Sequence, residues 1–153
     1  MYIPKEHFNF YKILSRESAE KYCHLKHQKT SIIISIRSSY DKVMPDVFIS
    51  KENGVKDVCS LAFDDVDMFN EHGIMTIEDG KKIADFINKW YGKTDLIIAH
   101  CDGGISRSAG VIAAIMRIKE GTEYPLIWSS SKHPNMLCYL QTLKGFGYIK
   151  EPD

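Results

Sequence analysis

The sequence predicts an α/β domain in which helices flank a central, mainly parallel sheet. Short apolar segments rich in β-branched residues alternate with longer segments whose apolar residues recur at helical spacing. The length of 153 residues suits one domain, and no internal repeat or Pro/Gly/Ser-rich linker divides the chain. A hydrophobic fraction of 44% is sufficient for a buried core. We therefore expect residues 1–153 to form a single domain.

Four segments are predicted to be strands: residues 8–14, 31–36, 58–63 and 96–99. The second is short, mainly apolar and β-branched, and the fourth is a similar apolar run; both are typical of buried strands. The third is a weaker strand signal and leads into an acidic stretch. The fourth ends at His100 and Cys101.

The first two helices are predicted from their capping residues. Ser15 can cap a helix that extends to about His27, because its hydroxyl accepts hydrogen bonds from exposed N–H groups of the first turn. Thr76 and Asp79 resemble a capping box, and apolar residues follow at helical spacing until Gly92 ends the helix.

Two further helices are predicted in the last third of the chain. Residues 106–120 are rich in apolar residues, and Gly121 lies just beyond them as a helix-ending residue. The last helix is expected to begin near Pro134 and Asn135, since proline suits the first turn of a helix.

Composition and charge exclude several function classes. The 20 Lys and Arg residues balance 20 Asp and Glu residues, so the chain lacks the basic character of general nucleic-acid or membrane-surface binders. No apolar run approaches the length of a membrane span, and the N-terminus lacks the layout of a signal peptide. Four scattered cysteines without a CxxC pair are typical of free thiols in a reducing compartment. We therefore expect a cytoplasmic protein.

The segment HCDGGISRS, residues 100–108, lies between a predicted strand and a predicted helix. Backbone N–H groups in such a loop, together with the helix N-terminus, form an anion site. Gly103 and Gly104 permit tight curvature, and Arg107 offers a planar fork of donors for two phosphate oxygens. Cys101 would lie at the mouth of this positive site, where the thiolate is favoured and can attack phosphorus in line.

This segment resembles the HCxxGxxR(S/T) signature of the cysteine-dependent protein tyrosine phosphatase superfamily. The positions in register are His100, Cys101, Gly104, Arg107 and Ser108. Three other stretches are similar to the compact, dual-specificity-like bacterial members: residues 31–36, 63–66 and 133–135. The alternative is a glycine-rich turn that contains Cys and Arg by chance, but a turn alone needs no such set of side chains.

The resemblance implies a phosphate monoester hydrolase, a protein tyrosine or dual-specificity phosphatase, that forms a cysteinyl-phosphate and needs no metal or other cofactor. It implies that Cys101 is the nucleophile, that Arg107 binds the phosphate and the transition state, and that Ser108 hydrogen-bonds the sulfur. His100 would orient the loop rather than transfer a proton. The residues expected to bind the substrate phosphate are Asp102, Gly103, Gly104, Ile105, Ser106 and Arg107.

Cleavage of a phosphate ester also requires a proton for the leaving oxygen, which an Asp on a separate loop supplies in this superfamily. Asp64, Asp65 and Asp67 follow a predicted strand that could lie beside the Cys101 strand. Residues 63–66 fit the Phe-x-Asp-Ile/Val pattern of the small bacterial members, with Asp65 at the position of the acid. We predict Asp65, with the other two carboxylates left as alternatives.

The loop composition also favours a substrate class. Members that hydrolyse inositol phospholipids or RNA 5′-phosphates often place Lys in this loop, and residues 102–106 contain none. Asp102 would repel additional phosphates if its side chain faced the pocket. With a neutral net charge, these observations favour a phosphorylated protein or a small phosphoester over nucleic acid or membrane lipid. Oligomeric state and the choice between phosphotyrosine and phosphoserine or phosphothreonine stay open.

Two other function classes are possible. The same pocket could bind phosphate with little turnover, and this reading gains weight if no Asp lies near the loop. A different thiolate enzyme, such as a rhodanese-like sulfurtransferase or an arsenate reductase, is disfavoured by the Arg107–Ser108 pair and the loop length.

The remaining His and Cys residues suggest no separate chemistry. His24 and His27 lie beside Cys23 without a second pair of ligands, so no metal site is expected. Cys59 and Cys138 fit buried positions, although either could capture an oxidised Cys101 if it were close.

Overall fold

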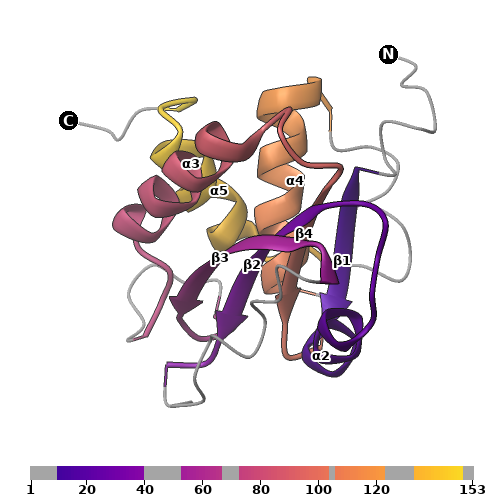
Figure 1. Ribbon diagram of the computed structural model, residues 1–153. Coiled ribbons are helices and arrows are strands. Elements are labelled where there is room, and N and C mark those ends of the chain that lie inside the picture. Colours follow the sequence, from indigo (N-terminus) through magenta and orange to yellow (C-terminus); the bar gives the residue numbers. More distant parts are fainter. Residues whose placement is uncertain (1–9, 40–52, 67–72, 104–105, 123–132, 150–153) are drawn as a thin grey trace.

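The computed structural model describes residues 10–39, 53–66, 73–103, 106–122 and 133–149. Its strands are β1 (Tyr11–Ser15), β2 (Ser31–Arg37), β3 (Val55–Ala62) and β4 (Leu96–Cys101). They form one sheet in the order β1-β4-β2-β3, and each neighbouring pair is parallel (Figure 1). The predicted α/β class with a parallel central sheet is confirmed.

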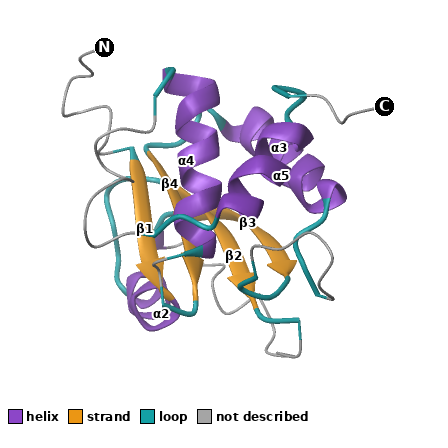
Figure 2. Cartoon of the chain, turned by 180° about the vertical axis from the view of Figure 1, so that it is seen from behind, coloured by secondary structure: helices purple, strands orange, loops and turns teal. Residues whose placement is uncertain are grey.

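Helices cover both faces of this sheet. They are α2 (Arg16–His24), α3 (Ile77–Trp90), α4 (Arg107–Glu120) and α5 (Met136–Gly145). The helices α3, α4 and α5 pack together over one face, whereas α2 lies against the other face (Figures 1 and 2). The sheet is therefore the middle layer of three, which explains why its two central strands are mainly apolar and almost completely buried.

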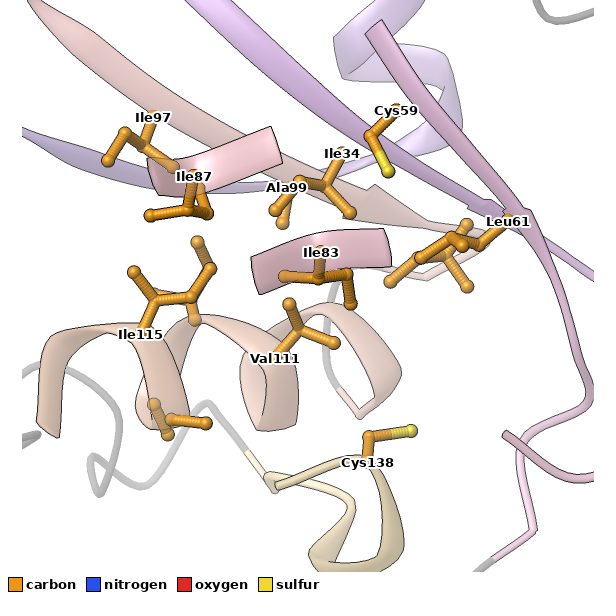
Figure 3. Close-up of a cluster of buried hydrophobic side chains, with 14 of the residues drawn as sticks. Ile34, Cys59, Leu61, Ile83, Ile87, Ile97, Ala99, Val111, Ile115 and Cys138 are labelled. Atoms are coloured by element: carbon orange, nitrogen blue, oxygen red, sulfur yellow. The ribbon is translucent and has the colours of Figure 1, made fainter. Parts of the chain in front are cut away.

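The alternation of side chains along β2 divides the core between the two faces. Ile32, Ile34 and Ile36 belong to the larger cluster beneath α3, α4 and α5, and Figure 3 shows Ile34 facing that layer. Ile33 points the opposite way, into a smaller cluster with Cys23 of α2. Full burial of such a side chain contributes roughly 1.5–3 kcal/mol, so both layers hold the central strands in place.

The predicted caps are present. The Ser15 hydroxyl accepts a hydrogen bond from the Ser18 N–H at 3.1 Å. Thr76 and Asp79 form a complete capping box at the start of α3. Gly121 ends α4 with a φ of 82°, a left-handed conformation that glycine adopts without steric penalty.

Two helix boundaries differ from the prediction. α2 ends at His24 rather than near His27, because Leu25 takes an extended conformation and the His27 N–H donates to the Asn53 carbonyl, turning the chain toward β2. α5 begins at Met136, so Pro134 precedes the helix instead of occupying its first turn, and Asn135 is the N-cap.

The contact between α3 and α5 is close at Gly80. A Cβ placed on Gly80 would overlap the carbonyl oxygen of Gln141 in α5, and backbone atoms leave no room to relax. We predict that Gly80→Ala lowers the free energy of unfolding by about 1–3 kcal/mol, as overpacking of a buried contact does. Denaturant unfolding monitored by tryptophan fluorescence measures this change.

The control for this substitution is Asp85→Ala, on the exposed side of the same helix. It should change the unfolding free energy by no more than about 0.5 kcal/mol. Equal stability of wild type and Gly80→Ala would show that the two helices do not approach each other this closely.

Candidate active site

The strand β4 delivers Cys101 to the carboxyl edge of the sheet. β4 lies between β1 and β2, and Cys101 is its last residue, with 2% of its surface exposed. The loop that follows leads directly into α4, which begins at Arg107. Gly104 and Ile105, two of the predicted phosphate-binding positions, lie outside the described residues. The expected strand–loop–helix setting is therefore present. Ligands of open α/β sheets bind at this edge of the sheet.

A hydrogen bond joins Cys101 to the first turn of α4. The Cys101 Sγ lies 3.2 Å from the Ser108 Oγ, and both side chains are buried. The contact implied by the family resemblance therefore exists. It fixes the sulfur against the N-terminus of a helix, where the helix dipole favours negative charge.

Arg107 is a buried cation with only 4% of its surface exposed. Its Nη1 donates to the Phe63 carbonyl oxygen at 2.8 Å and to the Ser38 hydroxyl at 3.4 Å. Its Nη2 pairs with Asp102 Oδ2 at 3.1 Å. No acceptor for the Arg107 Nε–H exists among the described residues. A buried donor left without an acceptor is unfavourable by roughly 1–3 kcal/mol, so this edge of the guanidinium suits an anion.

Asp102 turns its carboxylate toward Arg107 instead of away from it. The Oδ2 atom also accepts a hydrogen bond from the Ser38 hydroxyl at 3.2 Å, and the side chain remains about half exposed. Its backbone carbonyl accepts from the Arg16 N–H at 3.2 Å. A negative charge therefore lies next to the guanidinium edge where an anion would bind. Of its two neighbours in the loop, Gly103 is exposed and Ser106 is partly buried.

Of the three candidate acids, the structure brings Asp65 to the loop. Asp65 Oδ1 accepts hydrogen bonds from the Ser106 hydroxyl at 2.7 Å and from the Asn135 side-chain amide at 2.9 Å. Asp64 instead accepts from the backbone N–H and hydroxyl of Ser39, and the backbone bond is the main reason its pKa is lowered. Asp67 lies outside the described residues.

The expectation that the strand before Asp65 could lie beside the Cys101 strand is wrong. β2 separates β3 from β4 in the sheet. Asp65 nevertheless reaches the loop because parallel strands end at the same edge. After β3, the Phe63 N–H donates to the Arg37 carbonyl at the end of β2. The Phe63 carbonyl then accepts from Arg107, so the segment carrying Asp65 crosses the edge toward α4.

Two residues of this site were missed by the sequence reasoning. Asn135 belongs to a family-like stretch of the sequence, and an Asn before a helix indicates an N-cap, but neither signal predicts a contact with the acid. Ser38 follows β2 directly, and nothing in the sequence gives it a role. No sequence signal links either residue to Asp65 or to Arg107, since their contacts span 70 and 69 positions of the chain.

His100 lies behind the loop and is buried in the sheet. Its Nε2 is 2.7 Å from the Ser35 Oγ on the neighbouring strand β2. Burial lowers the pKa of His100 to about 4, and the positive charges of Arg16 and Arg107 act in the same direction. The imidazole is therefore neutral at pH 7, which suits a side chain that holds strand ends in position.

The other three cysteines differ from Cys101 in their surroundings. All four are free thiols. Burial raises the pKa of Cys23 and of Cys59 to about 11, and it raises the pKa of Cys138 further. These three thiols therefore stay protonated at neutral pH, as buried packing residues do.

The described part of the chain holds no cluster of metal ligands and no membrane-spanning helix. Within it, no group of three or more His, Cys, Asp or Glu residues is arranged to hold a metal ion. None of the described helices combines the length and apolar character needed to cross a membrane.

Comparison with known proteins identifies the fold. No protein-family model and no curated protein sequence matches the chain. Solved structures do match: Tk-PTP in its active form has 14% identity and a TM-score of 0.54, with 90% of each chain covered. PTPMT1 in complex with PI(5)P has 16% identity and a TM-score of 0.53, with 90% of this chain and 88% of that chain covered. The human tyrosine phosphatase-like serine/threonine/tyrosine-interacting protein has 18% identity and a TM-score of 0.53, with 78% of each chain covered.

The chain therefore has the fold of the protein tyrosine phosphatases. The resemblance stated from the HCDGGISRS segment is confirmed at the level of the fold, and the match extends over most of the chain rather than over the loop alone.

The buried His100 predicts a pH-dependent stability. Its pKa is about 4 in the folded chain and about 6.5 in an unfolded chain, so protons bind the unfolded state preferentially between these values. Stability from this group is complete above pH 6.5 and is lost as the pH falls toward 4, by up to about 3 kcal/mol.

We expect the unfolding free energy of wild type to fall more steeply between pH 7 and pH 4.5 than that of His100→Asn, which cannot titrate in this range. Denaturant unfolding at several pH values measures both curves. Parallel curves would mean that His100 is protonated equally readily in the folded and unfolded chains.

Proposed function

We propose that residues 1–153 form one catalytic domain of a protein tyrosine phosphatase-like enzyme that hydrolyses phosphate monoesters through a cysteinyl-phosphate. The observation that carries this proposal is the buried Arg107, whose Nε–H finds no acceptor among the described residues although the guanidinium is permanently charged. Cys101 and Ser108 are hydrogen-bonded beside it, and Asp65 is held at the same loop.

In the first step, the Cys101 thiolate attacks phosphorus opposite the leaving oxygen. An S–P bond forms while the P–O bond to the leaving group breaks, and the Asp65 carboxyl group gives its proton to the departing oxygen. Arg107 and the N-terminus of α4 stabilise the charge on the three remaining phosphate oxygens.

In the second step, water attacks the phosphorus of the phosphocysteine. The Asp65 carboxylate takes a proton from this water, and the S–P bond breaks as inorganic phosphate forms. The Ser108 hydroxyl donates a hydrogen bond to the departing sulfur. The 3.2 Å contact between Ser108 Oγ and Cys101 Sγ supports this role. Cys101 returns as the thiolate and Asp65 as the acid, so every proton and electron pair is accounted for without a cofactor.

A second reading makes the domain a phosphate-binding module with little turnover. One structural neighbour is named a tyrosine phosphatase-like interacting protein. The position of Asp65 argues for turnover. Its Oδ1 accepts a 2.7 Å hydrogen bond from the hydroxyl of Ser106, a residue of the loop that would bind the phosphate. A thiolate enzyme of the sulfurtransferase or arsenate reductase type has less support, because it leaves Arg107 and Ser108 without a role.

We further propose a phosphorylated protein or a small phosphoester as the substrate, in a reducing cytoplasm that keeps Cys101 as a thiol. PTPMT1 is described in complex with PI(5)P, a ligand with more than one phosphate group. In this chain the Asp102 carboxylate lies against Arg107 at 3.1 Å and adds negative charge beside the pocket. Its repulsion acts on every phosphate nearby, so a ligand with two phosphate groups is disfavoured more than a ligand with one.

The proposed activity is tested by hydrolysis of p-nitrophenyl phosphate in the presence of EDTA. We expect turnover by wild type, loss to the background rate in Cys101→Ser, and a decrease of kcat by about 100-fold in Asp65→Asn. The pH profile of Asp65→Asn should also lose the limb that depends on a protonated acid.

Asp64→Asn is the matched control, because that carboxylate bonds Ser39 rather than the loop. It should retain most of the activity. An inactive wild-type protein would refute the enzyme proposal, and a fully active Asp65→Asn with an unchanged pH profile would assign the acid to another residue.

The substrate proposal is tested by Asp102→Asn, which removes the negative charge beside Arg107. We expect kcat/KM for short-chain PI(5)P to rise by about 10-fold relative to kcat/KM for p-nitrophenyl phosphate, because repulsion of the second phosphate is relieved. The relative gain should shrink at high ionic strength. A wild-type preference for PI(5)P, or an unchanged ratio in the variant, would contradict the assignment.

A further inference from the structure

Asn135 uses its side chain in two directions at the start of α5. Its Oδ1 accepts a hydrogen bond from the Cys138 N–H at 3.0 Å, which caps the helix. Its Nδ2 donates to Asp65 Oδ1 at 2.9 Å and to the Val66 carbonyl at 3.1 Å. The residue is 5% exposed, so these bonds are largely shielded from water. A single amide thus connects the helix to the segment that carries Asp65.

The backbone of Asn135 adds a link to the phosphate-binding loop. Its N–H donates to the Ser106 carbonyl at 2.9 Å, and the Ser106 hydroxyl donates to Asp65 Oδ1 at 2.7 Å. Asp65, Asn135 and Ser106 therefore form a closed ring of hydrogen bonds. The ring joins three segments that are far apart in the sequence: the segment after β3, the loop before α4 and the start of α5.

The two side-chain donors of this ring bind the same oxygen of Asp65. Oδ1 accepts from the Asn135 amide and from the Ser106 hydroxyl, whereas Oδ2 accepts no hydrogen bond from any described residue. An oxygen that accepts two hydrogen bonds is a poor place for a proton. A proton on the carboxyl group is therefore directed to Oδ2, and the exposed position of Asp65 leaves that atom accessible.

We propose that Asn135 is a positioning residue for the proposed reaction: with Ser106 it binds Asp65 Oδ1, so that Oδ2 holds the proton and delivers it to the leaving oxygen. This inference rests on the proposed phosphatase function. It goes beyond helix capping, because a cap requires only the Oδ1 acceptor, whereas both N–H bonds of the Asn135 amide are directed at the segment of Asp65 and Val66.

The variant Asn135→Ser separates the two uses of the side chain. Serine is also a good N-cap, but its short hydroxyl cannot replace the amide that reaches Asp65. Proton delivery matters more for a poor leaving group than for a good one. We therefore compare phenyl phosphate, whose leaving phenolate is strongly basic, with p-nitrophenyl phosphate, whose leaving phenolate is weakly basic.

For Asn135→Ser we expect the ratio of kcat/KM on p-nitrophenyl phosphate to kcat/KM on phenyl phosphate to rise by about 10-fold over wild type, since kcat/KM reports the step that expels the leaving group. Ser106→Ala should raise the same ratio. In an Asp65→Asn background, Asn135→Ser should cause no further rise, because residues that act through one carboxyl group are not additive.

Thr76→Ala is the matched control, because it removes a helix cap from α3 outside this ring. It should lower the stability and leave the ratio of the two rates as in wild type. Should Asn135→Ser fold poorly, Asn135→Asp replaces it, because this variant keeps the size and the capping acceptor but has no donor for Asp65.

The outcomes distinguish this inference from the proposed function. Absence of turnover in wild type overturns the phosphatase assignment and the inference with it. No effect of Asp65→Asn on phenyl phosphate would assign the acid to another residue, which overturns the inference but leaves the phosphatase assignment standing. The inference alone is overturned if wild type is active and Asp65→Asn raises the ratio, but neither Asn135→Ser nor Asn135→Asp raises it. An additive rise in the Asp65→Asn background also overturns it, because Asn135 would then act independently of Asp65.

Discussion

The buried guanidinium of Arg107 is the constraint on which the rest of the site depends. A charge that cannot be neutralised by proton loss must be hydrogen-bonded where it is buried, or folding becomes unfavourable. The Phe63 carbonyl and the Asp102 carboxylate meet this need on two sides. Those bonds connect the end of β3 and the residue after Cys101 to Arg107, the first residue of α4. The hydrogen bonds that stabilise the buried guanidinium therefore also bring the parts of the site together. The remaining Nε–H faces no described acceptor, and this is the position that an anion can take.

The parallel sheet makes this assembly possible. Because its strands all run in one direction, the ends of β2, β3 and β4 meet at one edge and contribute Ser38, the segment of Asp65 and Cys101. Asn135, the N-cap of α5, then joins this edge by donating to Asp65. The apolar layers beneath α3, α4 and α5 hold these ends in register, so packing in the core sets the positions of polar groups at the edge.

The sequence predicted the local features of this molecule well. The capping box of Thr76 and Asp79 and the glycine stop at Gly121 depend on neighbours within a few residues, and both form as expected. The position of β3 in the sheet was not predictable in the same way. An apolar run identifies a strand but contains no information on its neighbour, and the register with β2 is set by packing against helices that lie elsewhere in the chain.

By itself, the sequence determined the α/β class, the strand–loop–helix setting of Cys101 and Arg107, and a short stretch of candidate acids, because each of these is encoded in contiguous residues. Only the tertiary structure brings Asp65 to Ser106 and Asn135, while Asp64 bonds Ser39. It also decided that Asp102 pairs with Arg107. These contacts depend on where separate chain segments meet in space. A hydrogen bond across 70 positions is specified by the packing of whole layers and by no local pattern.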